Sequence, residues 1–301
     1  MPIIVPEGLS SARLLRAERI EVLHGPPRNV STLRIALLNM TPDKTNTELQ
    51  FARLLGATGR HVELVPALPQ AYRTNPTSME LYMRWGERSL PPRLDGMIVI
   101  GAALDHMPFE DLAYWGELSS IFKWATSNVD SALYIGWAAF AALYMHHGVR
   151  PRVLPYKVSG VFQQQVMDSI DPLMAGLGAG FPCPVSRRAE VAVNDMPWRR
   201  GLTCLAQSME SGFCLVADAA NSANYMFDHL EYDAGTLRDE YLRDQSRRAG
   251  TTVPQNYLPN DDIAEVPSMV WRRSAQTFFA NWLTILAAGS NQVADQRRSA
   301  A

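Results

Sequence analysis

The stretch SALYIGWAAFAALY, residues 131–144, decides the fold because an apolar strand turns directly into a helix within it. Residues 132–135 are apolar and form a run of the length of a buried parallel strand. Residues 137–147 have the composition of a helix, which Gly148 would end. Gly136 occupies the turn between the two. Such a turn is typical of α/β proteins, in which parallel strands alternate with covering helices.

The same pattern recurs on the amino-terminal side of this stretch. Short apolar runs at residues 33–40, 61–68 and 97–101 predict further buried strands. Segments with helical periodicity separate them, including residues 110–124 and a helix that would begin with a capping box from Thr45 to Glu48. We therefore predict an α/β fold with a doubly wound, mostly parallel sheet and helices on both faces.

The pattern changes after Pro155. Short apolar runs at residues 191–193, 204–207, 213–217 and 225–227 predict an antiparallel section or sheet edge, followed by helices at residues 234–247 and 270–288. We divide the chain into an amino-terminal extension at residues 1–30 that packs on the domain, a single α/β domain at residues 31–289, and a frayed tail at residues 290–301.

Composition excludes several classes of protein. The 301 residues carry a formal net charge of −2, so no broad basic surface for nucleic acid is expected. No run of about 18 apolar residues and no apolar leader segment is present, so we expect no membrane partner and a cytoplasmic protein. The three cysteines, Cys183, Cys204 and Cys214, form no CxxC pair, which argues against a disulfide framework and a zinc site.

Ligands of doubly wound sheets bind at the carboxyl ends of the strands, so the residues that follow each strand are candidates for chemistry. At a nucleophile elbow, the position of Gly136 carries Ser or Cys, and backbone N–H groups of the following helix stabilise an oxyanion. An ordinary strand-to-helix turn with a tightly packed glycine explains Gly136 better when the turn is taken alone.

Two further places follow predicted strands. His229 and Glu231, in YMFDHLEYD at residues 225–233, are suited to a general base with an orienting carboxylate, although an HxE pair alone also fits a surface loop. Asp105, His106 and Glu110, in GAALDHMPFEDLAYW at residues 101–115, are possible metal ligands, but their spacing matches no established pattern. We therefore expect no metal.

Seven ordered segments together resemble the homoserine O-succinyl/acetyltransferase family of methionine biosynthesis, whose fold is similar to class I glutamine amidotransferases. They are MPIIVPEGLSSARLLRAERI, LRIALLNMTPDKTNTELQFARLL, DGMIVIGAALDHMPFEDLAYW, YKVSGVF, VSRRAEV, HLEYDAGTLRDEYLRD, and NYLPNDD followed by FFANWL. This resemblance covers most of the chain and implies an O-acyltransferase that forms a homodimer, holds no permanent cofactor and uses acyl-CoA as co-substrate.

The resemblance also implies roles for individual residues. His229 is similar to the family's catalytic base and Glu231 to its orienting partner, in a loop usually written HPEYD, where Leu230 replaces proline here. The backbone N–H of Trp137 resembles an oxyanion-hole donor. Lys157, Ser186 and Arg243 resemble groups that bind the amino-acid substrate, and the arginine would pair with its carboxylate. Asp105 falls at the position that selects the acyl group.

The chain departs from the family at Gly136, where the resemblance implies the cysteine that accepts the acyl group. Phe140, where related sequences tend to be polar, indicates a remodelled pocket, and Cys183 is close in sequence to Ser186. We expect direct attack of an amino-acid acceptor on acyl-CoA, assisted by His229, with acetyl favoured over succinyl and with room for a larger acceptor beside Gly136. The alternative is a non-catalytic homologue that binds an amino acid or acyl-CoA as a sensor or partner. An amidotransferase would need the missing cysteine.

Overall fold

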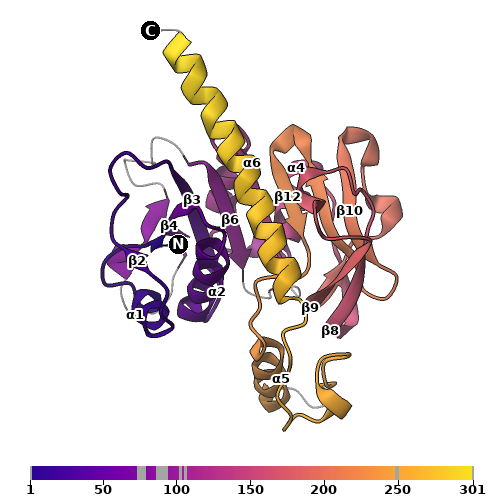
Figure 1. The fold of residues 1–301 in the computed structure, drawn as a ribbon. Helices are drawn as coiled ribbons and strands as arrows, with labels where there is room; N and C mark the ends of the chain where they lie inside the picture. The colour runs from indigo at the N-terminus through magenta and orange to yellow at the C-terminus, as the bar shows by residue number, and fades with distance from the viewer. Residues whose placement is uncertain are drawn as a thin grey trace.

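The chain folds around one mixed sheet with helices on both faces (Figure 1). The computed structural model describes residues 2–72, 79–85, 94–101, 104, 107–247 and 251–299, with side chains described as far as residue 289. Along the path of hydrogen-bonded neighbours the strand order is β2-β1-β4-β3-β6-β7-β12-β11-β10-β8-β9, and β5 (Met83–Trp85) pairs with β4.

The parallel half of the sheet contains the strands expected from the apolar runs. β3 (Thr32–Met40), β4 (His61–Pro69), β6 (Gly96–Gly101) and β7 (Ser131–Ile135) pair in parallel, in the order β4-β3-β6-β7. Their central residues have almost no exposed surface, as expected for strands covered on both faces. The prediction of a mostly parallel α/β sheet is confirmed.

Helices cover this half of the sheet from two sides. α2 (Lys44–Gly56) and α6 (Arg272–Ser299) contact each other and β3, whereas α3 (Trp115–Asn128) packs with α4 (Trp137–His147), which contacts β6, β7 and β12. In Figure 1, α2 and α6 cross the front of the sheet. Gly96 permits the close approach of α6, because a Cβ there would lie 3.0 Å from the Trp282 ring.

The antiparallel half is larger than the sequence indicated. β10 (Leu202–Ser208), β11 (Gly212–Asp218) and β12 (Ala223–Met226) match three expected strands, and β12 pairs in parallel with β7, which joins the two halves. The long pair β8 (Arg152–Val166) and β9 (Gly180–Glu190) was not predicted, because its polar residues and prolines hide the strand pattern. The strand expected at residues 191–193 is wrong, since β9 ends at Glu190 and a 3-10 turn, η4 (Val193–Asp195), follows.

Local details differ at several element ends. Asp43, and not Thr45, caps α2, because its side chain accepts a hydrogen bond from the backbone N–H of Asn46. α3 begins at Trp115, after the 3-10 turn η2 (Phe109–Asp111), and not at residue 110. α6 continues to Ser299, beyond the expected end at residue 288.

The amino-terminal segment contributes to the sheet. β1 (Ile3–Ile4) pairs in parallel with β4 and with β2 (Val22–Leu23), and α1 (Ser10–Ala17) packs against α2. The remaining elements are α5 (Thr236–Arg247) and the short 3-10 turns η1 (Met79–Leu81), η3 (Pro172–Met174), η5 (Trp198–Arg200), η6 (Ala219–Asn221) and η7 (Pro259–Asp261).

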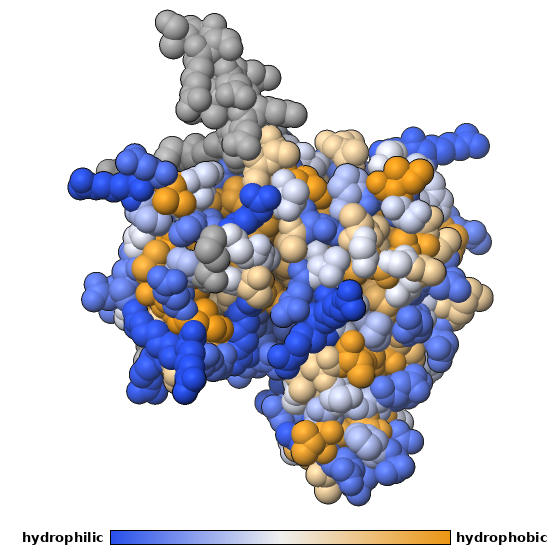
Figure 2. All heavy atoms as spheres, in the orientation of Figure 1, coloured by the Kyte–Doolittle hydropathy of each residue, from blue (hydrophilic) through white to orange (hydrophobic). Residues whose placement is uncertain are grey.

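Hydrophobic residues on the surface are interspersed with hydrophilic ones on the face shown in Figure 2. No helix in the described parts of the chain is both long and apolar enough to cross a membrane.

Candidate functional site

The turn between β7 and α4 has the backbone conformation of a nucleophile elbow. Gly136 has φ 58° and ψ −125°, a combination that favours glycine because a side chain is strained there. Its backbone N–H donates to the Met226 carbonyl over 2.8 Å, which fixes the turn against the end of β12. The N–H groups of Trp137 and Ala138, in the first turn of α4, have no acceptor within the helix and can bind an oxyanion.

His229 lies directly above this turn, on the loop that follows β12. Its Nδ1 is 2.7 Å from Glu231 Oε1, and its ring stacks on Tyr232 with a centroid distance of 4.3 Å. Its backbone N–H donates to the Pro184 carbonyl over 2.8 Å. Because the carboxylate accepts from Nδ1–H, Nε2 is the basic nitrogen of the neutral ring, and it faces the elbow.

The environment of His229 favours a proton on the ring. Burial lowers its pKa, but the negative charge and hydrogen bond of Glu231, with the more distant charges of Glu240 and Asp228, outweigh burial and raise the pKa above the ordinary value. A buried imidazole with this pKa can accept a proton from a hydroxyl and later donate it to a leaving group.

The space left by the missing elbow side chain is filled. A Cβ on Gly136 would lie 2.7 Å from His229 Cε1 and 2.9 Å from its Nε2, closer than real contacts allow. The imidazole thus occupies the position next to the elbow, and the expected room for a larger acceptor beside Gly136 is absent from this structure. A side chain at residue 136 requires His229 to move.

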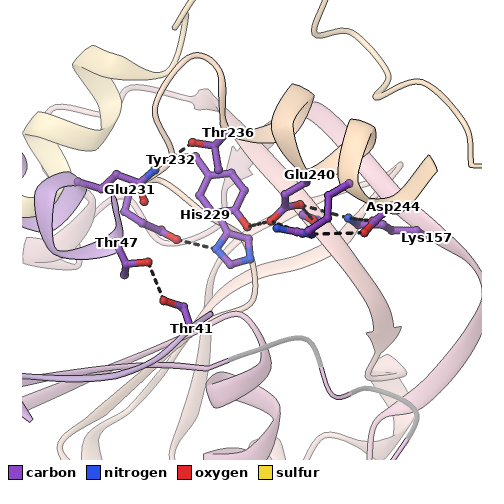
Figure 3. Close-up of polar contacts among 12 residues, drawn as sticks. Thr41, Thr47, Lys157, His229, Glu231, Tyr232, Thr236, Glu240 and Asp244 are labelled. Atoms are coloured by element: carbon purple, nitrogen blue, oxygen red, sulfur yellow. Dashed lines mark hydrogen bonds and ion pairs between the residues drawn. The ribbon is translucent and has the colours of Figure 1, made fainter. Parts of the chain in front are cut away.

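A second polar cluster lies next to His229 and is centred on Glu240 of α5 (Figure 3). Tyr232 donates to Glu240 Oε1 over 2.7 Å, Ser186 donates to Oε2, and Lys157 Nζ lies 3.2 Å from Oε2. Lys157 also pairs with Asp244 at 2.8 Å. Burial raises the pKa of Glu240, but the Lys157 charge and the two hydroxyl donors outweigh it, so the pKa is lowered and the carboxylate stays charged.

The structure brings together most of the residues singled out in the sequence. Lys157 on β8 and Ser186 on β9 meet through Glu240, and Figure 3 shows Lys157 beside Asp244, on the side of Glu240 away from His229. Arg243 lies at its outer rim, with its side chain 47% exposed and Nη2 4.0 Å from Glu240 Oε1. Asp105 and His106 lie outside the described residues.

Sequence reasoning missed Glu240 and Tyr232. A usable signal was present, because Glu240 is one helical turn before Arg243 on α5 and Tyr232 follows His229 by three residues. Glu240 lies among charged residues that are typical of the exposed face of a helix. Tyr232 lies in a segment that is typical of an ordinary loop.

Helix α2 anchors the loop that carries Glu231 and Tyr232. Gln50 donates to Thr236 over 2.9 Å, and Arg53 pairs with Asp233 at 2.5 Å. Trp271 Nε1 donates to the Tyr232 carbonyl over 2.8 Å from the opposite side. These contacts hold the His229 loop between α2 and the start of α6, so that its geometry is set before any ligand binds.

The environment of Cys183 keeps its thiol neutral. Cys183 lies on β9 without exposed surface, and burial raises the pKa of its thiol and of the neighbouring Cys214. One ligand atom each of Cys183, Cys214 and Asp228 lie within 4.8 Å of one another, which is compatible with a metal only if the thiols ionise. Glu110, the described member of the other possible metal set, is paired with Arg150 at 2.5 Å.

Comparisons of the sequence show which family the chain resembles. A sequence-family profile described as homoserine O-succinyltransferase matches residues 2–291. A homoserine O-acetyltransferase of Brucella canis is 40% identical over 290 residues, covering 94% of each chain. The homoserine O-acetyltransferase of Brucella melitensis biotype 1 has the same identity and coverage.

Solved structures share the fold at low identity. A glutamine amidotransferase of Thermotoga maritima superposes with a TM-score of 0.56 at 8% identity, covering 84% of this chain and 98% of its own. A glutamine amido transferase of Methylobacillus flagellatus gives 0.54 at 12% identity, with coverage of 85% and 96%. The expected amidotransferase-like fold is therefore confirmed.

Proposed function

The chain belongs to the homoserine O-succinyltransferase family and is an O-acyltransferase, and from this premise we propose that it transfers an acyl group from acyl-CoA directly to a homoserine-like amino acid. The proposal rests on the position of His229 Nε2 at the elbow. The imidazole lies beside the amino terminus of α4, in the space that a nucleophilic side chain would need. Glycine at position 136 offers no group that could carry the acyl chain.

The acceptor binds at the Glu240 cluster. Its ammonium group pairs with the charged Glu240 carboxylate, which the Tyr232 and Ser186 hydroxyls keep in place. Its carboxylate binds Lys157 and Arg243. Each of these side chains lies within 4.0 Å of acidic residues of α5 and leaves them to bind the substrate carboxylate. This arrangement points the side-chain hydroxyl of the acceptor toward His229.

The reaction then needs one base and one oxyanion site. His229 Nε2 takes the hydroxyl proton while the oxygen attacks the thioester carbonyl, and the N–H groups of Trp137 and Ala138 stabilise the resulting oxyanion. Collapse breaks the carbon–sulfur bond, and the CoA thiolate leaves with the proton from His229. Glu231 keeps the ring in the productive tautomer and stabilises its protonated form.

Acetyl is the favoured acyl group. This preference rests on Asp105 in the sequence, whose carboxylate would repel the distal carboxylate of a succinyl group. Steady-state rates with acetyl-CoA and succinyl-CoA test it, and a clear preference for succinyl-CoA contradicts it. The homodimer, the cytoplasmic location and the role in methionine biosynthesis stay predictions.

The central experiment measures free CoA release from acetyl-CoA with homoserine and with other hydroxy and amino acids, together with the intact mass of the protein. We expect acceptor-dependent release without a covalent acyl adduct. A stable adduct on the wild-type chain would contradict direct transfer. Binding of CoA or an amino acid without any release would favour the non-catalytic alternative and contradict the proposal.

A further inference from the structure

An apolar cavity of about 220 Å³ lies beside the first two turns of α4. We call it the α4 groove and define it by Met107, Phe109, Trp137, Phe140, Val153 and Ala189, which are among its lining residues. The groove lies between residues 107–109, helix α4 and the part of the β8–β9 pair that holds Val153 and Ala189. The acceptor chemistry at Glu240 uses none of these side chains.

The α4 groove borders the elbow at Trp137. The backbone N–H of Trp137 is an oxyanion donor at the elbow, whereas its indole ring forms part of the groove wall. Gly101 makes this position of the indole possible, because a Cβ at Gly101 would lie 2.6 Å from Trp137 Cε3. The wall of the groove therefore begins one residue from the elbow.

Phe140 gives the groove its apolar character. It is 2% exposed, and its ring packs at 4.8 Å from that of Phe227. Since residue 140 is one helical turn beyond Gly136, the side chain lies on the same face of α4 as the elbow. The remodelling indicated by Phe140 in the sequence thus affects this groove.

The outer end of the groove is open and bordered by positive charge. Val153 is 61% exposed, which is a large exposure for an apolar side chain at the mouth of a cavity. Arg150, a lining residue three positions before Val153, has a side chain that is 58% exposed. It contacts both oxygens of the exposed Glu110 carboxylate and the Tyr144 hydroxyl, so a phosphate that binds Arg150 replaces this carboxylate.

From these features we infer that the α4 groove binds the pantetheine arm of the acyl-CoA donor, with the CoA phosphates outside beside Arg150. The inference rests on the proposed function for the identity of the donor. A small acyl group would fit an enclosed pocket, whereas a CoA thioester needs a channel that is apolar within, open at its far end and cationic at its mouth. The groove has all three properties.

Calorimetric titration with CoA itself, which needs no turnover, is the direct test. Val153→Glu places a carboxylate at the mouth and should weaken CoA binding by tenfold or more. The matched control is Val193→Glu, which makes the same charge change at a valine that is 60% exposed and does not line the groove, and it should change the affinity less than twofold. A second variant, Ala189→Trp, fills the groove from within and should have the same effect as Val153→Glu.

Kinetics with two donors separates the groove from the reaction centre. Acetyl-CoA carries the full arm, whereas S-acetyl-N-acetylcysteamine lacks the phosphates and most of the arm. Val153→Glu should lower kcat/KM at least tenfold more for acetyl-CoA than for the short thioester. Equal losses with both donors, or unchanged CoA affinity in both groove variants, would overturn the inference.

The results that would contradict the transferase reaction differ from those that would contradict the groove assignment. If CoA binds to the wild type and loses affinity in both groove variants, but no acceptor receives an acyl group, the groove assignment holds and the transferase reaction does not. If acetyl is transferred from the short thioester while CoA does not bind, the reaction holds and the groove assignment is wrong.

Discussion

Gly136 and His229 have to be considered as a pair. The backbone at residue 136 has φ 58°, which glycine adopts without strain, and the Cβ of any other residue would lie 2.7 Å from the imidazole. The first N–H groups of α4 have no acceptor within the helix and can bind an oxyanion. The structure therefore combines the backbone of an elbow with an imidazole in close contact with it.

Gly136→Cys tests whether the elbow can still accept an acyl group. The new thiol would lie at the α4 amino terminus beside His229, where its pKa falls and its reactivity rises. Because the His229 ring must shift and a side chain is strained at this φ, we expect the free energy of unfolding to decrease by about 1–3 kcal/mol. Intact-mass spectrometry after incubation with acetyl-CoA should show one added acetyl group.

Gly136→Ala is the matched control for that experiment. It causes the same strain and the same contact with His229 but has no thiol, so it should be destabilised to a similar extent without becoming acylated. A folded cysteine variant that never acylates would show that the displaced His229 no longer supports the elbow chemistry.

The pKa of His229 predicts the pH dependence of transfer. The neutral ring is the active base, and its pKa is raised, so the rate should increase with pH through a value above the ordinary histidine range. Glu231→Gln removes a charge that raises this pKa and leaves the lowering effect of burial. The acidic limb of the kcat/KM profile should therefore move to lower pH, and the plateau should fall on the order of 10²- to 10⁴-fold.

The exposed carboxylate Glu210 provides the comparison for this profile. Glu210→Gln removes a negative charge without touching the site and should leave both the limb and the plateau in place. An acidic limb that stays fixed in Glu231→Gln would mean that His229 is not the group that titrates.

At the scale of elements, α5 carries the proposed acceptor site. Glu240→Gln should raise the KM for the acceptor about 10²-fold, because the ammonium group loses its buried charged partner, while kcat changes much less. Lys157 keeps Asp244 as a partner at 2.8 Å, so the variant should fold. Asp239→Asn, at the adjacent exposed carboxylate of the same helix, is the control, and an equal KM increase in both variants would remove Glu240 from the acceptor site.

Elements with a regular apolar pattern could be predicted from the sequence, and those with mixed patterns could not. β3, β6 and β7 are buried over most of their length and appear as apolar runs, whereas β4 is buried on both faces only after Val65. β8 was missed because one end is exposed, Pro155 interrupts it, and Gln163, Gln164 and Gln165 alternate poorly with apolar residues. The convergence of Lys157, Ser186 and Glu240 depends on this unpredicted pair of strands, so their contact could not be derived from spacing.

At the scale of the whole molecule, the parallel and antiparallel halves meet at a buried polar network at the end of α4. His147 Nε2 lies 2.6 Å from Asp218 Oδ2, and Tyr225 donates to the same oxygen over 2.7 Å. Tyr225 also contacts His146 Nδ1 at 2.7 Å. Since Asp218 belongs to β11 and Tyr225 to β12, this network ties α4 to the strands that join the two halves.

The titration of His146 should make the stability of this junction depend on pH. Burial, as the largest cause, lowers the pKa of His146 to about 4. The His147 charge also lowers it, whereas the Asp218 charge and a hydrogen bond with the Phe122 backbone raise it. Tyr134 of β7 packs against the ring at 5.9 Å, so the site stays apolar on that side. A histidine with a lowered folded-state pKa binds its proton more readily in the unfolded chain, and the folded state therefore loses stability as pH falls from about 6.5 toward 4.

His146→Gln removes this titration and keeps a polar side chain that can still contact Tyr225. The free energy of unfolding, measured by urea denaturation between pH 7 and pH 4, should therefore fall less steeply in the variant than in the wild type, by about 1–3 kcal/mol over the range. His61→Gln, on β4 and outside this network, provides the comparison for loss of a histidine. If the free energy of unfolding falls equally steeply with pH in the wild type and in His146→Gln, water reaches the ring in the folded state. Burial disfavours the protonated ring only where the ring is shielded from water.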